Sequence, residues 1–124
     1  MARLTRILGT VVALVITSVA LSSCGTSGAV TDARAACVLV QRAITLQNQS
    51  DAPGLSATRR ATLKGQAMSE LLKATPKAAD ATSLDGSWNA LMTTINESER
   101  VPLTNLVPSL TRLCRVANSS SPYL

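Results

Sequence analysis

The stretch DARAACVLVQRAITLQN, residues 32–48, decides the fold, because one of its faces is spaced as an α-helix is. Thr31 precedes the stretch as a candidate N-cap, and Asp32 places a carboxylate in the first turn, where the helix dipole favours negative charge. The segment therefore predicts an amphipathic helix with a cysteine on its buried face. That face comprises Ala33, Ala36, Cys37, Val40, Ile44 and Gln47.

A second helix is expected after a short loop. Residues 48–55, NQSDAPGL, contain the Asn, Asp, Pro and Gly that are typical of turns. Ser56 is a candidate N-cap for a helix that reaches about Ala74. Its inner face is expected to comprise Ala57, Ala61, Met68, Leu71, Leu72 and Thr75. Its solvent side then carries Arg59, Arg60, Lys64 and Lys73.

A third helix is predicted over residues 76–97. Thr75 as N-cap with Pro76 at the first helical position is a common helix start. An alternative start uses Thr82 and Asp85 as a capping box. The apolar residues are spaced by three and four, as in the seam of a helical bundle. They are Ala81, Leu84, Trp88, Leu91 and Ile95, with Trp88 expected as a large core residue.

A fourth helix is predicted from Pro102 to about Ala117, after a loop at 96–102. Pro108 lies inside it and lacks the N–H that would bond to Thr104, so a kink or a restart is expected there. Residues 118–124 form a polar tail. The apolar side comprises Leu103, Leu106, Val107, Leu110, Leu113, Cys114 and Ala117.

The predicted fold is all-α. Alternating β-branched or aromatic runs bounded by turns, which would indicate strands, are absent from the sequence. Four helices joined by short loops favour an up-down-up-down bundle, with the domain expected over residues 32–117. In this topology the start of the first helix lies beside the end of the fourth.

The first 24 residues have the order of parts of an export signal. Arg3 and Arg6 form a positive region, and residues 7–21 are apolar and uncharged. Such a run is shorter than the roughly 20 residues of a transmembrane helix, and suits the apolar region of a cleaved signal peptide. The run ends in Leu-Ser-Ser-Cys at 21–24, ahead of the Gly/Ser/Thr-rich residues 25–31.

This ending resembles the lipobox of bacterial lipoproteins. The resemblance implies a diacylglycerol on the sulfur of Cys24, cleavage of a signal peptide over 1–23, and a flexible lipidated tether over 24–31. It places the domain on the extracytoplasmic face of the bacterial cell membrane, with the membrane itself as a partner. An uncleaved helical anchor or an ordinary secreted precursor are the alternatives. The Ala/Arg/Thr-rich composition without Phe is similar to that of small uncharacterised lipoproteins of high-GC Gram-positive bacteria.

With Cys24 assigned to lipid, Cys37 and Cys114 remain. Disulfides persist in exported domains, so a bridge between these two is expected, with two buried free thiols as the alternative. The predicted bundle puts both cysteines at similar positions along its long axis. The bridge would close a loop of about 78 residues, worth roughly 4–5 kcal/mol in the chain-entropy model.

The charge of the mature chain is mild. Ten Lys and Arg stand against seven Asp and Glu, a formal charge of +3 with the N-terminus acylated. Nothing in this balance indicates a nucleic-acid partner. Arg59, Arg60 and Lys64 form a basic strip, interpreted as a solvated helix face or, alternatively, a contact for anionic headgroups.

The sequence contains no pattern of catalytic residues. It has no histidine, no CxxC pair and no phosphate-binding loop, and its acids are scattered. We therefore expect no enzymatic activity, no cofactor and no metal site. The expected function is a non-enzymatic interaction module of the cell envelope. The alternative is a small carrier of a lipid or other apolar ligand, which would need an internal cavity of at least ~300 Å³.

Overall fold

A computed structural model describes the backbone of residues 21–119 and the side chains of residues 27–119. The helices are α1 (Leu21–Ser50), α2 (Ala57–Leu84), α3 (Asn89–Glu97) and α4 (Leu103–Asn118), with a short 3₁₀ helix, η1 (Gly86–Trp88), before α3. No strand occurs among residues 21–119. The prediction of an all-α bundle is confirmed.

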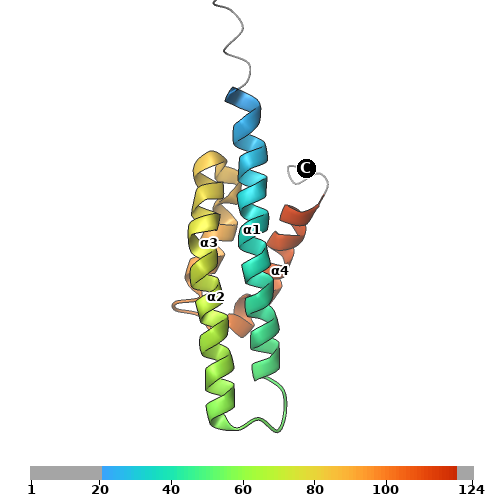
Figure 1. The fold of residues 1–124 in the computed structure, drawn as a ribbon, viewed down its shortest axis with the longest axis vertical. Coiled ribbons are helices and arrows are strands. Elements are labelled where there is room, and N and C mark those ends of the chain that lie inside the picture. Colours follow the sequence, from blue (N-terminus) through green and yellow to red (C-terminus); the bar gives the residue numbers. More distant parts are fainter. Residues whose placement is uncertain (1–20, 120–124) are drawn as a thin grey trace, which may run out of the picture.

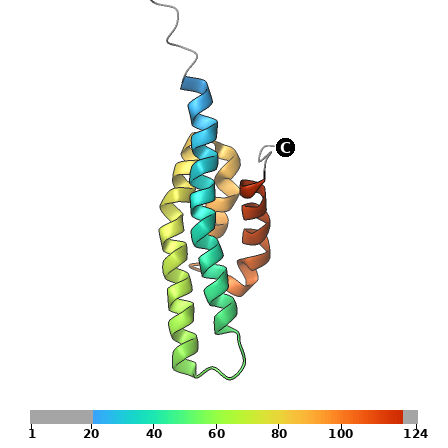
Figure 2. The same cartoon turned by 45° about the vertical axis from the view of Figure 1, so that its right-hand side comes forward.

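The helices run up and down in turn (Figure 1). α1 and α2 form a long antiparallel hairpin, and the shorter α3 and α4 return along it, as the turned view in Figure 2 shows. The neighbouring pairs are α1–α2, α2–α3, α3–α4 and α1–α4. The end of α4 therefore lies beside the first half of α1.

The predicted flexible tether over 24–31 is wrong, because these residues belong to α1. Ala29 and Val30 are already buried in the core, and this burial offsets the poor helix propensity of the glycines at 25 and 28. The predicted N-cap is also wrong. The hydroxyl of Thr31 donates to the carbonyl of Ser27, 2.9 Å away, as a residue inside a helix does.

The predicted break between the second and third helices, at Thr75 and Pro76, is wrong as well. α2 continues through Pro76, which is exposed to solvent. Buried alanines on both sides of the proline hold the two halves of α2 in line against α1. They are Ala74, Ala78 and Ala81, each fully inaccessible to solvent.

The chain breaks instead at Asp85, which has extended backbone angles. Its carboxylate accepts from the N–H of Ser87 at 3.0 Å and so caps η1, rather than closing a capping box with Thr82. The turn also takes Leu84 out of the predicted seam, and the side chain of Leu84 is left half exposed. Ala81, Trp88, Leu91 and Ile95 are buried as predicted.

Large aliphatic side chains from α1–α4 meet in one core. Between α1 and α2, however, most of the buried residues are alanines, and small side chains allow two helices to approach closely. On α1 these are Ala29, Ala33, Ala36 and Ala43, and on α2 they are Ala67, Ala74, Ala78 and Ala81. The largest fully buried apolar side chains are Val40, Leu71, Leu91, Ile95 and Leu110. Of the six residues predicted on the inner face of the second helix, only Leu71 is buried. Met68 and Thr75 are half-buried, and Ala57, Ala61 and Leu72 are exposed.

α4 passes through Pro108 without restarting. Pro108 is exposed, while Leu106 and Leu110 on either side of it are buried and keep the helix against the core. The helix begins one residue after the predicted Pro102, which is its N-cap. Of the predicted tail, residues 120–124 lie outside the described part of the chain.

Candidate functional site

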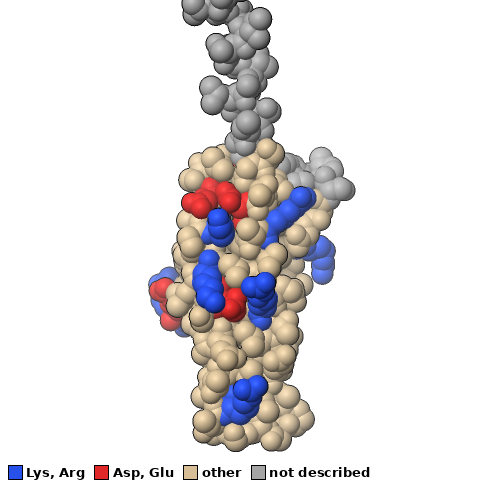
Figure 3. Space-filling view, in the orientation of Figure 1, with Lys and Arg blue, Asp and Glu red and all other residues tan. Residues whose placement is uncertain are grey.

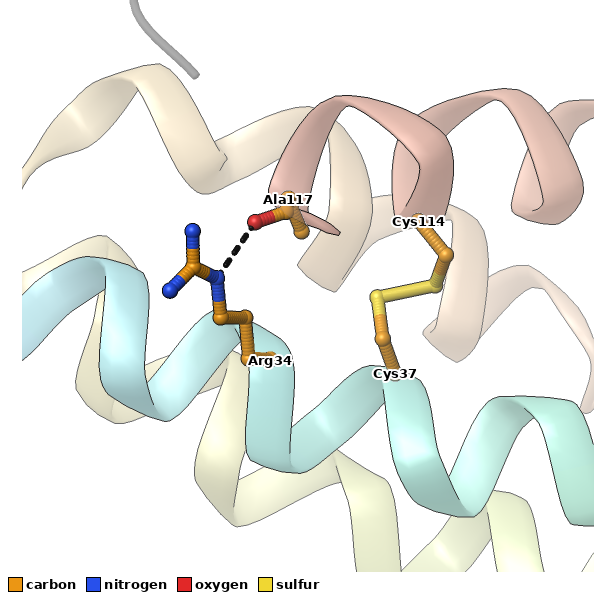
Figure 4. Close-up of a disulfide and its surroundings, with 4 residues drawn as sticks. All are labelled: Arg34, Cys37, Cys114 and Ala117. Atoms are coloured by element: carbon orange, nitrogen blue, oxygen red, sulfur yellow. Dashed lines mark hydrogen bonds between the residues drawn. A yellow bond between two sulfur atoms is a disulfide. The ribbon is translucent and has the colours of Figure 1, made fainter. Parts of the chain in front are cut away.

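The predicted disulfide between Cys37 of α1 and Cys114 of α4 is present. The sulfur atoms are 2.09 Å apart and the Cα atoms 5.5 Å apart. Figure 4 shows the bridge crossing directly between the two helices. Both cysteines are almost completely buried, so the bridge ties the last helix to the first within the core.

One turn before Cys37, Arg34 holds the end of α4 (Figure 4). Its Nε donates to the carbonyl of Ala117 at 2.8 Å, and its Nη2 donates to the carbonyl of Ser119 at 3.1 Å. Carbonyls at a helix C-terminus lack partners inside the helix and carry partial negative charge, so a guanidinium satisfies both needs. In the sequence, Arg34 is only one of the ten Lys and Arg residues of the mature chain, and no local pattern marks this role.

We expect Arg34→Ala to lower the free energy of unfolding by about 1–2 kcal/mol, since two charge-assisted hydrogen bonds to α4 are lost. Urea denaturation followed by circular dichroism measures this change. Arg42→Ala is the matched control, because Arg42 is exposed on the same helix and should change the stability by less than about 0.5 kcal/mol. Equal stability of the two variants would show that Arg34 does not hold α4.

The second polar contact between segments lies at the opposite end of α1. The Nε2 of Gln47, a residue predicted on the buried face, donates to both carboxylate oxygens of Asp51 at 3.2 Å and to Oγ1 of Thr104 at 3.1 Å. The Nη1 of Arg60 donates to the carbonyl of Ser50 at 2.7 Å. Arg60 therefore caps α1, and the predicted basic strip reduces to the exposed Arg59 and Lys64.

An open groove of about 590 Å³ lies along α1. Its wall includes both cysteines of the bridge and the apolar side chain of Val38, which is 54% exposed. The groove is lined by Cys37, Val38, Gln41, Arg42, Thr45 and Leu46 of α1, Glu70 of α2, and Cys114 and Asn118 of α4. We call this surface the disulfide groove.

Two opposite charges stand on the disulfide groove. Glu70 pairs through Oε1 with Nζ of Lys73 at 3.1 Å, while its Oε2 is buried and makes no hydrogen bond. Arg42 supplies a guanidinium. Figure 3 shows acidic and basic side chains interleaved on the face it draws, without a large patch of one sign. The groove can therefore bind an apolar group flanked by polar ones, and it holds no pair of groups arranged for acid–base catalysis.

A smaller hollow of about 340 Å³ lies where the α3–α4 loop meets the hairpin. Ser98, at its edge, is buried and donates to the carbonyl of Ile95 at 2.6 Å. Gln47 also lines this hollow, and its side-chain amide already donates to Asp51 and Thr104. Its polar side chains thus serve the packing of the loop.

Cys24, the predicted lipidation site, lies within the residues of α1, and its side chain is outside the described set. Residues 1–20 of the predicted signal peptide are likewise outside it. Lipidation therefore stays a prediction. Among residues 21–119, no helix is long and apolar enough to span a membrane. No group of three potential metal-ligating side chains occurs within the same part of the chain.

Comparison with known proteins gives no match: no family model fits the chain, and no curated protein or solved structure is significantly similar to it.

Proposed function

We propose that this protein is a lipid-anchored interaction module on the extracytoplasmic face of a bacterial membrane, without enzymatic activity. The observation that carries the proposal is the division of the three cysteines. Cys37 and Cys114 are bridged, as suits an exported domain, and Cys24 stands alone at the end of the lipobox-like Leu-Ser-Ser-Cys. Two or more acyl chains on that cysteine would provide a durable anchor.

The disulfide groove is the binding surface in this proposal. It combines an exposed apolar residue, Val38, with the charged groups of Arg42 and Glu70 at its sides. An apolar centre with a polar rim is the usual composition of a protein–protein contact. The bridge in its wall holds α1 and α4 together, so the surface is rigid before a partner binds.

A carrier of a small apolar ligand is the second candidate, and the size of the disulfide groove favours it. Its volume of about 590 Å³ lies in the range of ligand sites. However, the groove is open rather than enclosed. A ligand in it would keep one side in contact with water, which fits a partner's side chains better than a free lipid.

Native mass spectrometry of the protein extracted from its own membranes in mild detergent tests the anchor. We expect a mass that begins at Cys24, carries added acyl groups, and is lighter by the two hydrogens lost in the Cys37–Cys114 bridge. The variant Cys24→Ser should leave the membrane fraction. Finding the wild-type chain without acyl groups would contradict the proposed location.

The same spectra test the groove. A complex with another protein should weaken at least tenfold in Val38→Asp, because a carboxylate then replaces the apolar side chain; this corresponds to about 1.4 kcal/mol. Leu72→Asp is the matched control, since Leu72 is similarly exposed but lies outside the groove. A small bound molecule that Val38→Asp removes would favour the carrier. Equal binding by both variants would exclude the groove from either role.

A further inference from the structure

The anchor cysteine and the bundle are joined by helix rather than by a flexible tether. α1 spans Leu21–Ser50, and the core begins at Ala29, five residues after Cys24. At 1.5 Å per residue this separation is only about 7.5 Å. If Cys24 is lipidated, as the proposed function requires, one end of the bundle must lie close to the bilayer surface.

The same end of the molecule contains the connection from α2 to α3. Figures 1 and 2 both show this connection at the same end as the start of α1, whose first turns extend beyond it, and the α1–α2 loop at the opposite end. A Cβ placed on Gly28 would lie 3.3 Å from Cδ1 of Leu84. Leu84 therefore packs against α1 only one turn after Cys24, with half of its surface still exposed.

The residues next to Leu84 in the chain, Ser83, Asp85, Gly86 and Ser87, are small and, apart from Asp85, uncharged. Asp85 is half-buried, and its carboxylate is engaged in capping η1. Residues 81–90 contain no Lys or Arg. A turn with an exposed leucine and no basic residue of its own suits the zwitterionic headgroup region and the adjoining acyl chains, because neither demands a cationic surface.

We propose that this end of the bundle, residues 84–88, rests on the same bilayer that holds the acyl chains of Cys24, with Leu84 inserted at the boundary between headgroups and acyl chains. α1 then stands away from the membrane. The α1–α2 loop lies farthest from it, about 39 Å from Cys24 along the helix. The inference rests on the proposed lipid anchor and adds the face and the orientation of the contact.

The test uses the lipidated, isotope-labelled protein in phosphatidylcholine nanodiscs that carry a small fraction of lipid with a gadolinium-chelate headgroup. Paramagnetic broadening falls steeply with distance. Amide signals of residues 84–88 should therefore broaden several-fold more than those of residues 51–55 in the α1–α2 loop. Cys24→Ser, mixed with the same nanodiscs, should show no such gradient.

Leu84→Gln should reduce the broadening at residues 85–88, whereas Leu72→Gln should not. Leu72 is 57% exposed against 50% for Leu84, and lies about 18 Å farther back along the same helix. Equal broadening of amide signals along the bundle, or the strongest broadening at residues 51–55, would overturn the proposed orientation while leaving the lipid anchor intact. An unchanged profile in Leu84→Gln would overturn the insertion of Leu84. Absence of acyl groups on Cys24 would overturn the anchor and this inference together.

Discussion

Removal of the Cys37–Cys114 bridge is expected to lower the free energy of unfolding by about 4–5 kcal/mol. The bridge joins residues separated by 77 positions, so its loss releases a large loop in the unfolded chain. Domains of this size are commonly stable by only about 5–15 kcal/mol. The double variant Cys37→Ala/Cys114→Ala should therefore be close to unfolding at physiological temperature.

Urea denaturation of the Cys24→Ser protein, with and without the two further substitutions, measures the effect without the membrane. Reduction of the intact bridge by dithiothreitol should give a similar loss, which separates the missing crosslink from the replaced side chains. A fall of less than about 1 kcal/mol would mean that packing alone holds α4 in place.

Leu110→Ala is expected to cost about 2–5 kcal/mol, because it leaves a cavity in a core that cannot close around it. Leu110 is fully buried in the middle of α4. The alanine-rich surfaces of α1 and α2 leave few long side chains nearby that could move into the space. Thermal and urea unfolding of the bridged protein give the value.

Leu72→Ala provides the comparison, since Leu72 is exposed on α2 and its truncation should cost less than about 0.5 kcal/mol. Equal losses in the two variants would contradict the assignment of Leu110 to the core. A loss for Leu110→Ala below about 1 kcal/mol would mean that α4 repacks around the space.

The number and order of the helices could be predicted because each has a strong apolar period. Their ends were harder to predict where local and tertiary preferences conflict. Pro76 is a common helix start, yet buried alanines on both sides of it keep α2 continuous. Thr31 is a good N-cap by type, yet the burial of Ala29 and Val30 draws the helix past it. Packing thus outweighed capping in both places.

The disulfide could be predicted because Cys37 and Cys114 are the two cysteines left once Cys24 is assigned to lipid, and the predicted topology brings them to one height along the bundle. The two arginine caps could not, since Arg34 and Arg60 bond to carbonyls of other segments, and no local pattern in the sequence identifies such partners. The disulfide groove depends on the relative placement of three helices, which periodicity does not specify. Leu84 was misplaced because Asp85 ends α2 one residue later.

The bridge between α1 and α4 also determines how the domain responds to a pulling force. Tension applied between the start of α1 and the end of α4 passes down α1 to Cys37 and crosses directly to Cys114. The residues between the two cysteines lie outside this path and bear no load. About 250 Å of chain that could otherwise be drawn out stays folded. The bridge thus shields α2, α3 and most of the core from a force applied through the ends of α1 and α4.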